Sequence, residues 1–161
     1  MEQGITVFKA GVAAVCGALT ALWGWFGWLV VAWVACMVID YATGSAAAMK
    51  AGEWASGKAR EGLWHKFGCI VAVLVSGLLD FVIGMLLDHV QVLTLPWDYS
   101  VLLCPLVTAW YILTELGSII ENAGALGAPM PGFLKKAVAA LKAGVDAAGD
   151  HSVDSDSGKE G

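Results

Sequence analysis

Residues 10–39, AGVAAVCGALTALWGWFGWLVVAWVACMVI, decide the class of fold, because this stretch contains no Asp, Glu, Lys, Arg or His. A helix needs about 20 mainly apolar residues to cross a hydrocarbon core of about 30 Å. Two shorter charge-poor stretches follow at residues 67–79 and 99–114. The chain is 58% hydrophobic and 14% charged, whereas a soluble domain carries about 25% charged residues. The sequence therefore predicts an all-α integral membrane protein.

The number of spans depends on how residues 10–39 are divided. As a single helix this stretch would be roughly 45 Å long at about 1.5 Å per residue, which is long for one crossing. Its middle, WGWFGW at residues 23–28, has aromatic side chains that favour the membrane–water interface and glycines that permit a tight turn. We therefore predict four transmembrane helices, with three as the alternative if the first is one long tilted helix. The four spans are expected at about residues 4–22, 27–49, 62–87 and 99–122.

The basic residues give the orientation of the chain in the membrane. Cytoplasmic loops are enriched in Lys and Arg, and in the four-span arrangement all 9 Lys and Arg residues fall on one side. Both termini are then cytoplasmic. The connection between the second and third spans is predicted to be a basic cytoplasmic loop that holds Lys50, Lys58, Arg60 and Lys66.

The same connection contains GEWASGKA, residues 52–59, which has the G-x-x-x-x-G-K spacing of a phosphate-binding loop. That motif needs a Ser or Thr hydroxyl for the magnesium ion at the next position, where this chain has Ala59. A phosphate-binding loop also follows a β-strand, and here an apolar helical run precedes it. The pattern therefore argues against a nucleotide site.

Beyond the transmembrane domain, predicted at residues 1–128, the composition of the chain changes. Residues 129–149 are predicted to form an amphipathic helix on the membrane surface, with a soluble flanking helix as the alternative. Its apolar face carries Leu134, Val138, Leu141 and Val145, and its basic residues are Lys135, Lys136 and Lys142. Residues 150–161 are acidic and rich in Ser and Gly, which predicts a disordered tail.

Three carboxylates lie within the predicted spans: Asp40, Asp80 and Glu115. A charge at mid-helix costs about 2.5–3.5 kcal/mol on insertion scales, so these residues are expected to face other helices. In the last span a polar stripe recurs at steps of three and four residues: Thr108, Tyr111, Glu115, Ser118 and Asn122. Such a stripe can form a hydrogen-bonded network inside one unit, line an aqueous path shared in an oligomer, or relay protons or ions.

The remaining reactive side chains do not suggest an enzyme. The cysteines, Cys16, Cys36, Cys69 and Cys104, are far apart, and each lies in or beside an apolar run. They form no C-x-x-C or Cys/His cluster, and we interpret them as reduced, small hydrophobic side chains. No catalytic, cofactor or metal site is predicted, and no basic surface suggests nucleic-acid binding.

Four short blocks carry a resemblance to a known family. The blocks are DYxTG at residues 40–44, Ser56 with GLxxK at 62–66, ExxSIIEN at 115–122, and GxPxP at 127–131. In this order they resemble the bacteriophage holin family, which includes clostridial toxin-secretion holins, over about residues 39–136. The resemblance implies a homo-oligomer in the bacterial inner membrane that opens lesions at a set time. An endolysin or toxin then leaves through the lesions, without a stable complex with the holin.

The acidic tail of this chain departs from the basic tails of many holins. Two other classes of function also stay open. One is a small ion channel or transporter that uses Asp40, Asp80 and Glu115 as coupling or selectivity groups. The other is a non-conducting membrane scaffold. The chain shows no inverted repeat and no Pro-interrupted helix pair of the kind found in transporters, which favours the holin hypothesis over the first.

Overall fold

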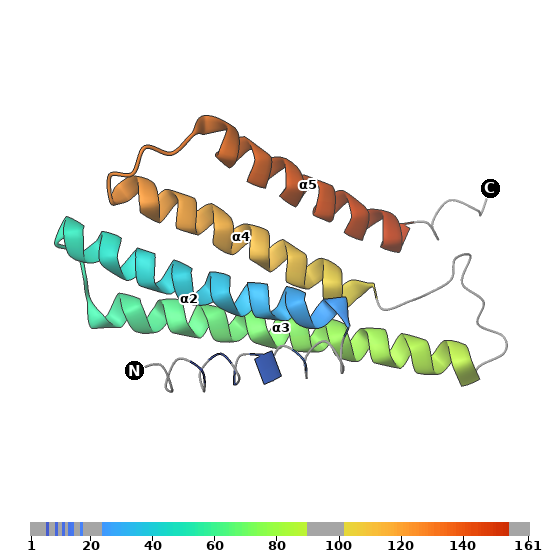
Figure 1. The fold of residues 1–161 in the computed structure, drawn as a ribbon. Coiled ribbons are helices and arrows are strands. Elements are labelled where there is room, and N and C mark those ends of the chain that lie inside the picture. Colours follow the sequence, from blue (N-terminus) through green and yellow to red (C-terminus); the bar gives the residue numbers. More distant parts are fainter. Residues whose placement is uncertain are drawn as a thin grey trace.

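The computed structural model describes residues 24–89 and 102–154, together with a few helical residues between Thr6 and Gly17. Within 24–89 and 102–154 the chain forms four helices and no strands: α2 (Trp25–Ala51), α3 (Ser56–His89), α4 (Leu103–Ala125) and α5 (Gly132–Asp154). In Figure 1, α4 lies between α5 on one side and α2 and α3 on the other. Helices α2, α3 and α4 are each long and apolar enough to cross a membrane. The predicted all-helical fold is confirmed for the described residues, with three helices that are candidates for membrane spans.

The predicted break in the apolar run of residues 10–39 occurs at Gly24. Its backbone has φ 56°, a conformation that favours glycine, and α2 begins at the next residue, Trp25. The predicted first span, residues 4–22, lies outside the described residues apart from a few positions. The choice between three and four spans therefore stays a prediction.

The connection between α2 and α3 is shorter than the predicted basic loop. Gly52 ends α2 in the left-handed conformation, with φ 72°. The amides of Gly52 and Glu53 then donate to the carbonyls of Met49 and Ala48, at 3.1 and 3.0 Å, as in a common glycine-terminated helix end. Helix α3 begins at Ser56.

Placing the four basic residues of this region in a loop was therefore wrong. Lys50 belongs to the last turn of α2, whereas Lys58, Arg60 and Lys66 belong to α3. The physical reason is that the first turns of α3, SGKAREGLWHK, are rich in residues that favour helix despite their charge.

Two other helix boundaries differ from the predictions. Helix α4 begins at Leu103 rather than near residue 99. Helix α5 continues to Asp154, so the first residues of the predicted disordered tail are helical. Alanines at 147 and 148 favour this extension. Helix α5 packs along α4, and its predicted place on a membrane surface stays a prediction.

The hydrophobic core is small and lies where α2, α3 and α4 meet. It consists of Trp33, Met37, Cys69, Val73 and Cys104, with Tyr111 among the residues packed against it. The rings of Trp33 and Tyr111 stack at a centroid distance of 6.0 Å. Large apolar side chains instead cover the outside of α3, among them Trp64, Leu74, Leu78 and Phe81. Soluble proteins rarely expose an apolar surface of this extent, so this surface is suited to lipid.

Candidate functional site

The polar stripe of α4 points into the bundle, toward α2 and α3. Thr108 and Glu115 are buried, whereas Tyr111, Ser118 and Asn122 are half-buried. Thr108 is fully enclosed and donates its hydroxyl to the carbonyl of Cys104 at 2.7 Å. The stripe therefore meets protein groups within one unit. Its predicted role in opening or in oligomer contacts stays a prediction.

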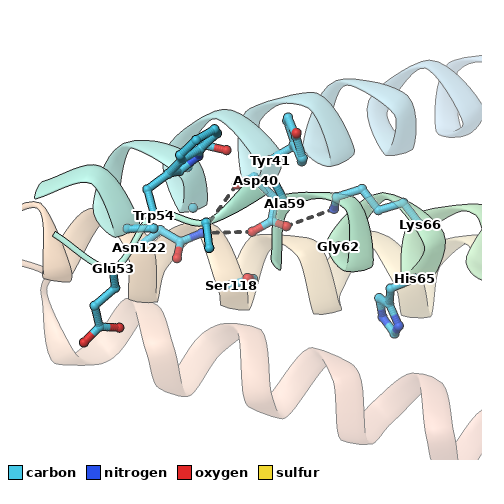
Figure 2. A pocket seen from close by; sticks show the side chains of 14 residues that line it. Asp40, Tyr41, Glu53, Trp54, Ala59, Gly62, His65, Lys66, Ser118 and Asn122 are labelled. Carbon is cyan, nitrogen blue, oxygen red and sulfur yellow. Dashed lines mark hydrogen bonds and ion pairs between the residues drawn. The ribbon is translucent and has the colours of Figure 1, made fainter. Parts of the chain in front are cut away.

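Lys66 of α3 joins the carboxylates of the two neighbouring helices. Its Nζ lies 2.9 Å from Asp40 Oδ2 on α2 and 2.5 Å from Glu115 Oε2 on α4. All three side chains are largely buried. Figure 2 shows the Lys66 side chain extending toward Asp40. We call Asp40, Lys66 and Glu115 the central ion cluster, since one residue comes from each of the three spanning helices.

The central ion cluster lies near the middle of α4 and nearer the start of α3, where Lys66 is about 15 Å from Ser56 and about 35 Å from His89 at about 1.5 Å per residue. Along α4, Glu115 is about 18 Å from Leu103 and about 15 Å from Ala125, at about 1.5 Å per residue. An unpaired charge near the middle of a membrane-spanning helix costs about 2.5–3.5 kcal/mol. Pairing both carboxylates with one ammonium group reduces this cost and ties the three helices to each other.

Asn122 extends the cluster toward the ends of α2 and α4. Its Nδ2 donates to Asp40 Oδ1 at 3.0 Å and lies 3.3 Å from Thr43 Oγ1. Gly44 makes this approach possible, since a Cβ at that position would lie only 3.3 Å from Asn122 Nδ2. Thr43 satisfies its own hydroxyl by donating to the carbonyl of Ile39 at 2.8 Å. The family-like block at residues 40–44 thus contacts the block at residues 115–122.

Beside the cluster is a cavity of about 280 Å³. Asp40, Lys66, Ser118 and Asn122 line it, and Trp54 from the α2–α3 connection also contributes. Water in such a cavity needs two to four polar partners, which these side chains can provide. The cavity gives the central ion cluster room for several water molecules on one side.

Both ends of α4 are bound by charged side chains from other helices. At the start, Asp80 of α3 accepts hydrogen bonds from the amides of Leu103 and Cys104, at 3.0 and 2.7 Å. At the end, Lys50 of α2 donates to the carbonyls of Ala125 and Leu126, at 3.3 and 2.7 Å. The charges of these two side chains are opposite to those of the helix dipole, because the anion lies at the N-terminus and the cation at the C-terminus.

The outer side of α4 contacts α5 through Trp110. Its indole Nε1 donates to Asp146 Oδ1 at 2.6 Å, and Lys142 Nζ lies 3.9 Å from the centroid of its ring. Two cavities, of about 400 and 290 Å³, separate the same two helices. Residues lining the larger one include Gly117, Glu121, Lys135 and Val138. This contact is looser than the one on the inner side of α4.

The structure groups some of the predicted site residues and separates others. It brings Asp40 and Glu115 together, but Asp80 lies about 21 Å from Lys66 along α3 and acts as a helix cap. The sequence places Lys66 in the basic loop beside the cytoplasmic half of the stripe, whereas the structure places it in the interior, between Asp40 and Glu115. The spacing of Cys69, Ser76 and Asp80 on α3 points back to it one turn earlier. Trp110 lies outside the predicted stripe and had no sequence signal.

The cysteines and acidic residues in the described part of the chain do not form other sites. Cys69 and Cys104 are buried free thiols, and Cys36 is half-buried and free. Among the described residues, no group of three or more His, Cys, Asp or Glu side chains is placed to hold a metal ion.

Comparison with known proteins identifies similar chains. Residues 17–143 match the bacteriophage holin family. A protein of Halalkalibacterium halodurans, described as uncharacterized, is 31% identical over 136 residues, covering 84% of this chain and 94% of the relative. An uncharacterized protein of Clostridium perfringens is 31% identical over 141 residues, covering 88% of this chain and 95% of the relative. No solved structure matches the chain significantly.

Proposed function

Because this chain belongs to the bacteriophage holin family, we propose that it acts as a holin. It accumulates in the bacterial inner membrane, associates with further copies of itself and forms lesions. A cell-wall hydrolase or a toxin leaves through these lesions, and neither needs to form a stable complex with the chain. Both termini lie in the cytoplasm, on the side where the basic residues gather.

The central ion cluster is the observation that carries this proposal. It gives a small three-helix unit a closed interior in which Lys66 lies 2.9 Å from Asp40 and 2.5 Å from Glu115. Unpaired polar groups in hydrocarbon cost several kcal/mol each, so a single unit in lipid stays closed. The hydrophobic core around the cluster is small, which leaves polar contacts as a large share of what holds the helices.

Association of many copies changes this balance. When units crowd together, the groups of the cluster can exchange their internal partners for water and for the same groups of neighbouring units. The free energy gained by this exchange depends on the number of neighbouring units. Opening therefore rises steeply with the local density of the protein. A lesion that forms at a set time requires this kind of dependence.

The proposal is tested by inducing the chain in a bacterium, with and without a cytoplasmic muralytic enzyme. We expect sudden lysis at a reproducible time only when the enzyme is present, because a holin lesion gives the enzyme access to the cell wall. Continued growth with a selective ion flux would overturn the proposal in favour of a channel. Continued growth without any flux would favour a scaffold.

Variants of Glu115 link the lysis to the cluster. Glu115→Gln keeps the shape of the side chain and removes its charge, so we expect a shifted lysis time with normal insertion. Glu115→Leu removes the polar group, and we expect lysis to be lost or strongly delayed. Glu61→Leu is the matched control, since Glu61 is exposed near the start of α3. Normal membrane levels and an unaltered lysis time for Glu115→Leu would contradict the role of the cluster.

A further inference from the structure

Helix α5 lies along α4 at a depth that does not suit its charges in lipid. The chain leaves α4 at Ala125, and Trp110 is about 22 Å from that end at about 1.5 Å per residue. Asp146 and Lys142 contact Trp110, which is about 10 Å from the other end of α4, so both charged groups lie within the length of a helix that can span the membrane. Lipid at that position would leave their remaining polar atoms without partners.

The gap between the two helices is lined by apolar side chains and by several charged ones. Glu121 of α4 and Lys135 and Lys142 of α5 line the cavity of about 400 Å³, and Asp146 and Asp150 line the one of about 290 Å³. Cavities that are lined by charged side chains hold water. The docked position of α5 is therefore compatible with water, rather than lipid, on this side of α4.

The apolar surface of α5 is wider than α4 can cover. Leu134, Val138 and Val145 are half-buried on the side toward α4. Phe133 and Leu141 remain 73% and 60% exposed, although at 100° per residue they belong to the same broad apolar sector. A bilayer surface would cover the whole sector and leave the lysines in the headgroup region.

We infer that α5 has two docking partners, the lipid surface and the outer side of α4, and that it moves from the first to the second when a lesion fills with water. In an isolated unit, α5 lies on the membrane surface. In the lesion, the α4–α5 hairpin forms the wetted wall, with Trp110 binding Asp146 and water in the cavities between the two helices. This inference rests on the proposed function and names the helix that lines the lesion.

Disulfide crosslinking in the full-length chain tests this movement. In a background without the native cysteines, Gly117→Cys and Val138→Cys join α4 to α5, since a Cβ at Gly117 would lie 4.0 Å from Val138 Cγ1. The control pair is Gly77→Cys in a background that retains Cys104 and lacks the other native cysteines, since Cys104 Sγ lies 3.5 Å from a Cβ at Gly77. These separations suit a disulfide. Both pairs are oxidised in cells before and at the onset of enzyme-dependent lysis.

We expect the crosslinked fraction of the α4–α5 pair to rise at least about fivefold at lysis, the ratio that about 1 kcal/mol of preference produces. The control pair should crosslink equally at both times. Equal α4–α5 crosslinking before and at lysis, or none while lysis proceeds, would overturn the inference and leave the proposed function intact. A cysteine-free parent that never causes lysis would overturn the proposed function, and this inference with it.

A second variant tests the cause of the movement and does not depend on its timing. Lys142→Met with Asp146→Asn removes both deep charges and keeps an acceptor oxygen for Trp110. Docking in lipid is then less unfavourable, so crosslinking between positions 117 and 138 should already be high before lysis. Unchanged early crosslinking in this variant would contradict the inference.

Discussion

The two sides of α4 are built differently. On the inner side, Glu115 and Asn122 meet partners from α2 and α3 at hydrogen-bonding distance. On the outer side, Trp110 makes the two polar contacts with α5, and cavities of about 400 and 290 Å³ lie beside them. The inner side joins the three helices that can span a membrane, whereas the outer side holds α5 through the contacts of Trp110. Substitutions on each side should therefore differ in their effect on stability.

The largest effect is expected from Lys66→Met, which leaves two buried carboxylates without their common cation. Removing one member of a buried ion pair costs about 3–5 kcal/mol. The free energy of unfolding, measured by titrating sodium dodecyl sulfate into detergent micelles, should fall by about that amount. Arg60→Met is the matched control, because Arg60 is exposed on the same helix. A triple variant with Asp40→Asn and Glu115→Gln should recover most of the loss. Equal effects of Lys66→Met and Arg60→Met would remove the distinction between the two sides.

The next largest effect is expected from Asp80→Ala, which removes the acceptor for the first two amides of α4. Leaving buried donors unsatisfied costs about 1–3 kcal/mol. The same detergent titration should show this loss, and amide exchange at Leu103 and Cys104 should become faster. Asp80→Asn retains an acceptor oxygen and should lose less. Slow exchange at both amides in Asp80→Ala would show that another group binds them.

A smaller effect is expected from Lys50→Met at the other end of α4. Lys50 is exposed, and a cation at a helix C-terminus contributes about 0.3–1 kcal/mol. The loss of stability should shrink further at high salt, which screens exposed charges. Measuring the variant and the parent at low and high ionic strength separates this electrostatic contribution. A loss that is independent of salt would instead indicate a packing role for the lysine stem.

The smallest effect is expected from Trp110→Phe, on the outer side of α4. The change removes the donor to Asp146 and keeps an aromatic ring beneath Lys142. Changes at exposed contacts usually stay within about 0.5 kcal/mol, so the free energy of unfolding should hardly change. The time of lysis should change if the docked α5 stabilises the lesion. A loss of stability as large as that of Lys66→Met would show that both sides of α4 hold the folded unit equally.

The fold could be predicted from hydropathy because the spanning helices must satisfy their backbone groups internally. The break at Gly24 and the inward polar stripe of α4 followed from local signals, namely glycines among aromatics and a period of three and four residues. The partners of these groups could not be found in the same way. A hydropathy pattern assigns Lys66 to a loop, because other charged residues lie near it in the sequence. The pattern does not indicate that Lys66 binds two carboxylates on other helices.

The helix ends show the same limit. Capping rules search within a few residues of a helix start, whereas the cap of α4 is Asp80, on the preceding helix. The contact between Trp110 and Asp146 likewise joins side chains far apart in sequence. Such pairs depend on how whole helices are placed against each other, which periodicity in one helix cannot specify.

The two caps of α4 also have a consequence for the order in which the chain assembles. Lys50 and Asp80 both precede α4 in the sequence, and a growing chain emerges from its N-terminus at about 5–20 residues per second. The groups that bind the ends of α4 therefore leave the ribosome before Leu103 does. Helix α4 is the last of the three helices to be made, and both partners of its ends lie on segments that precede it.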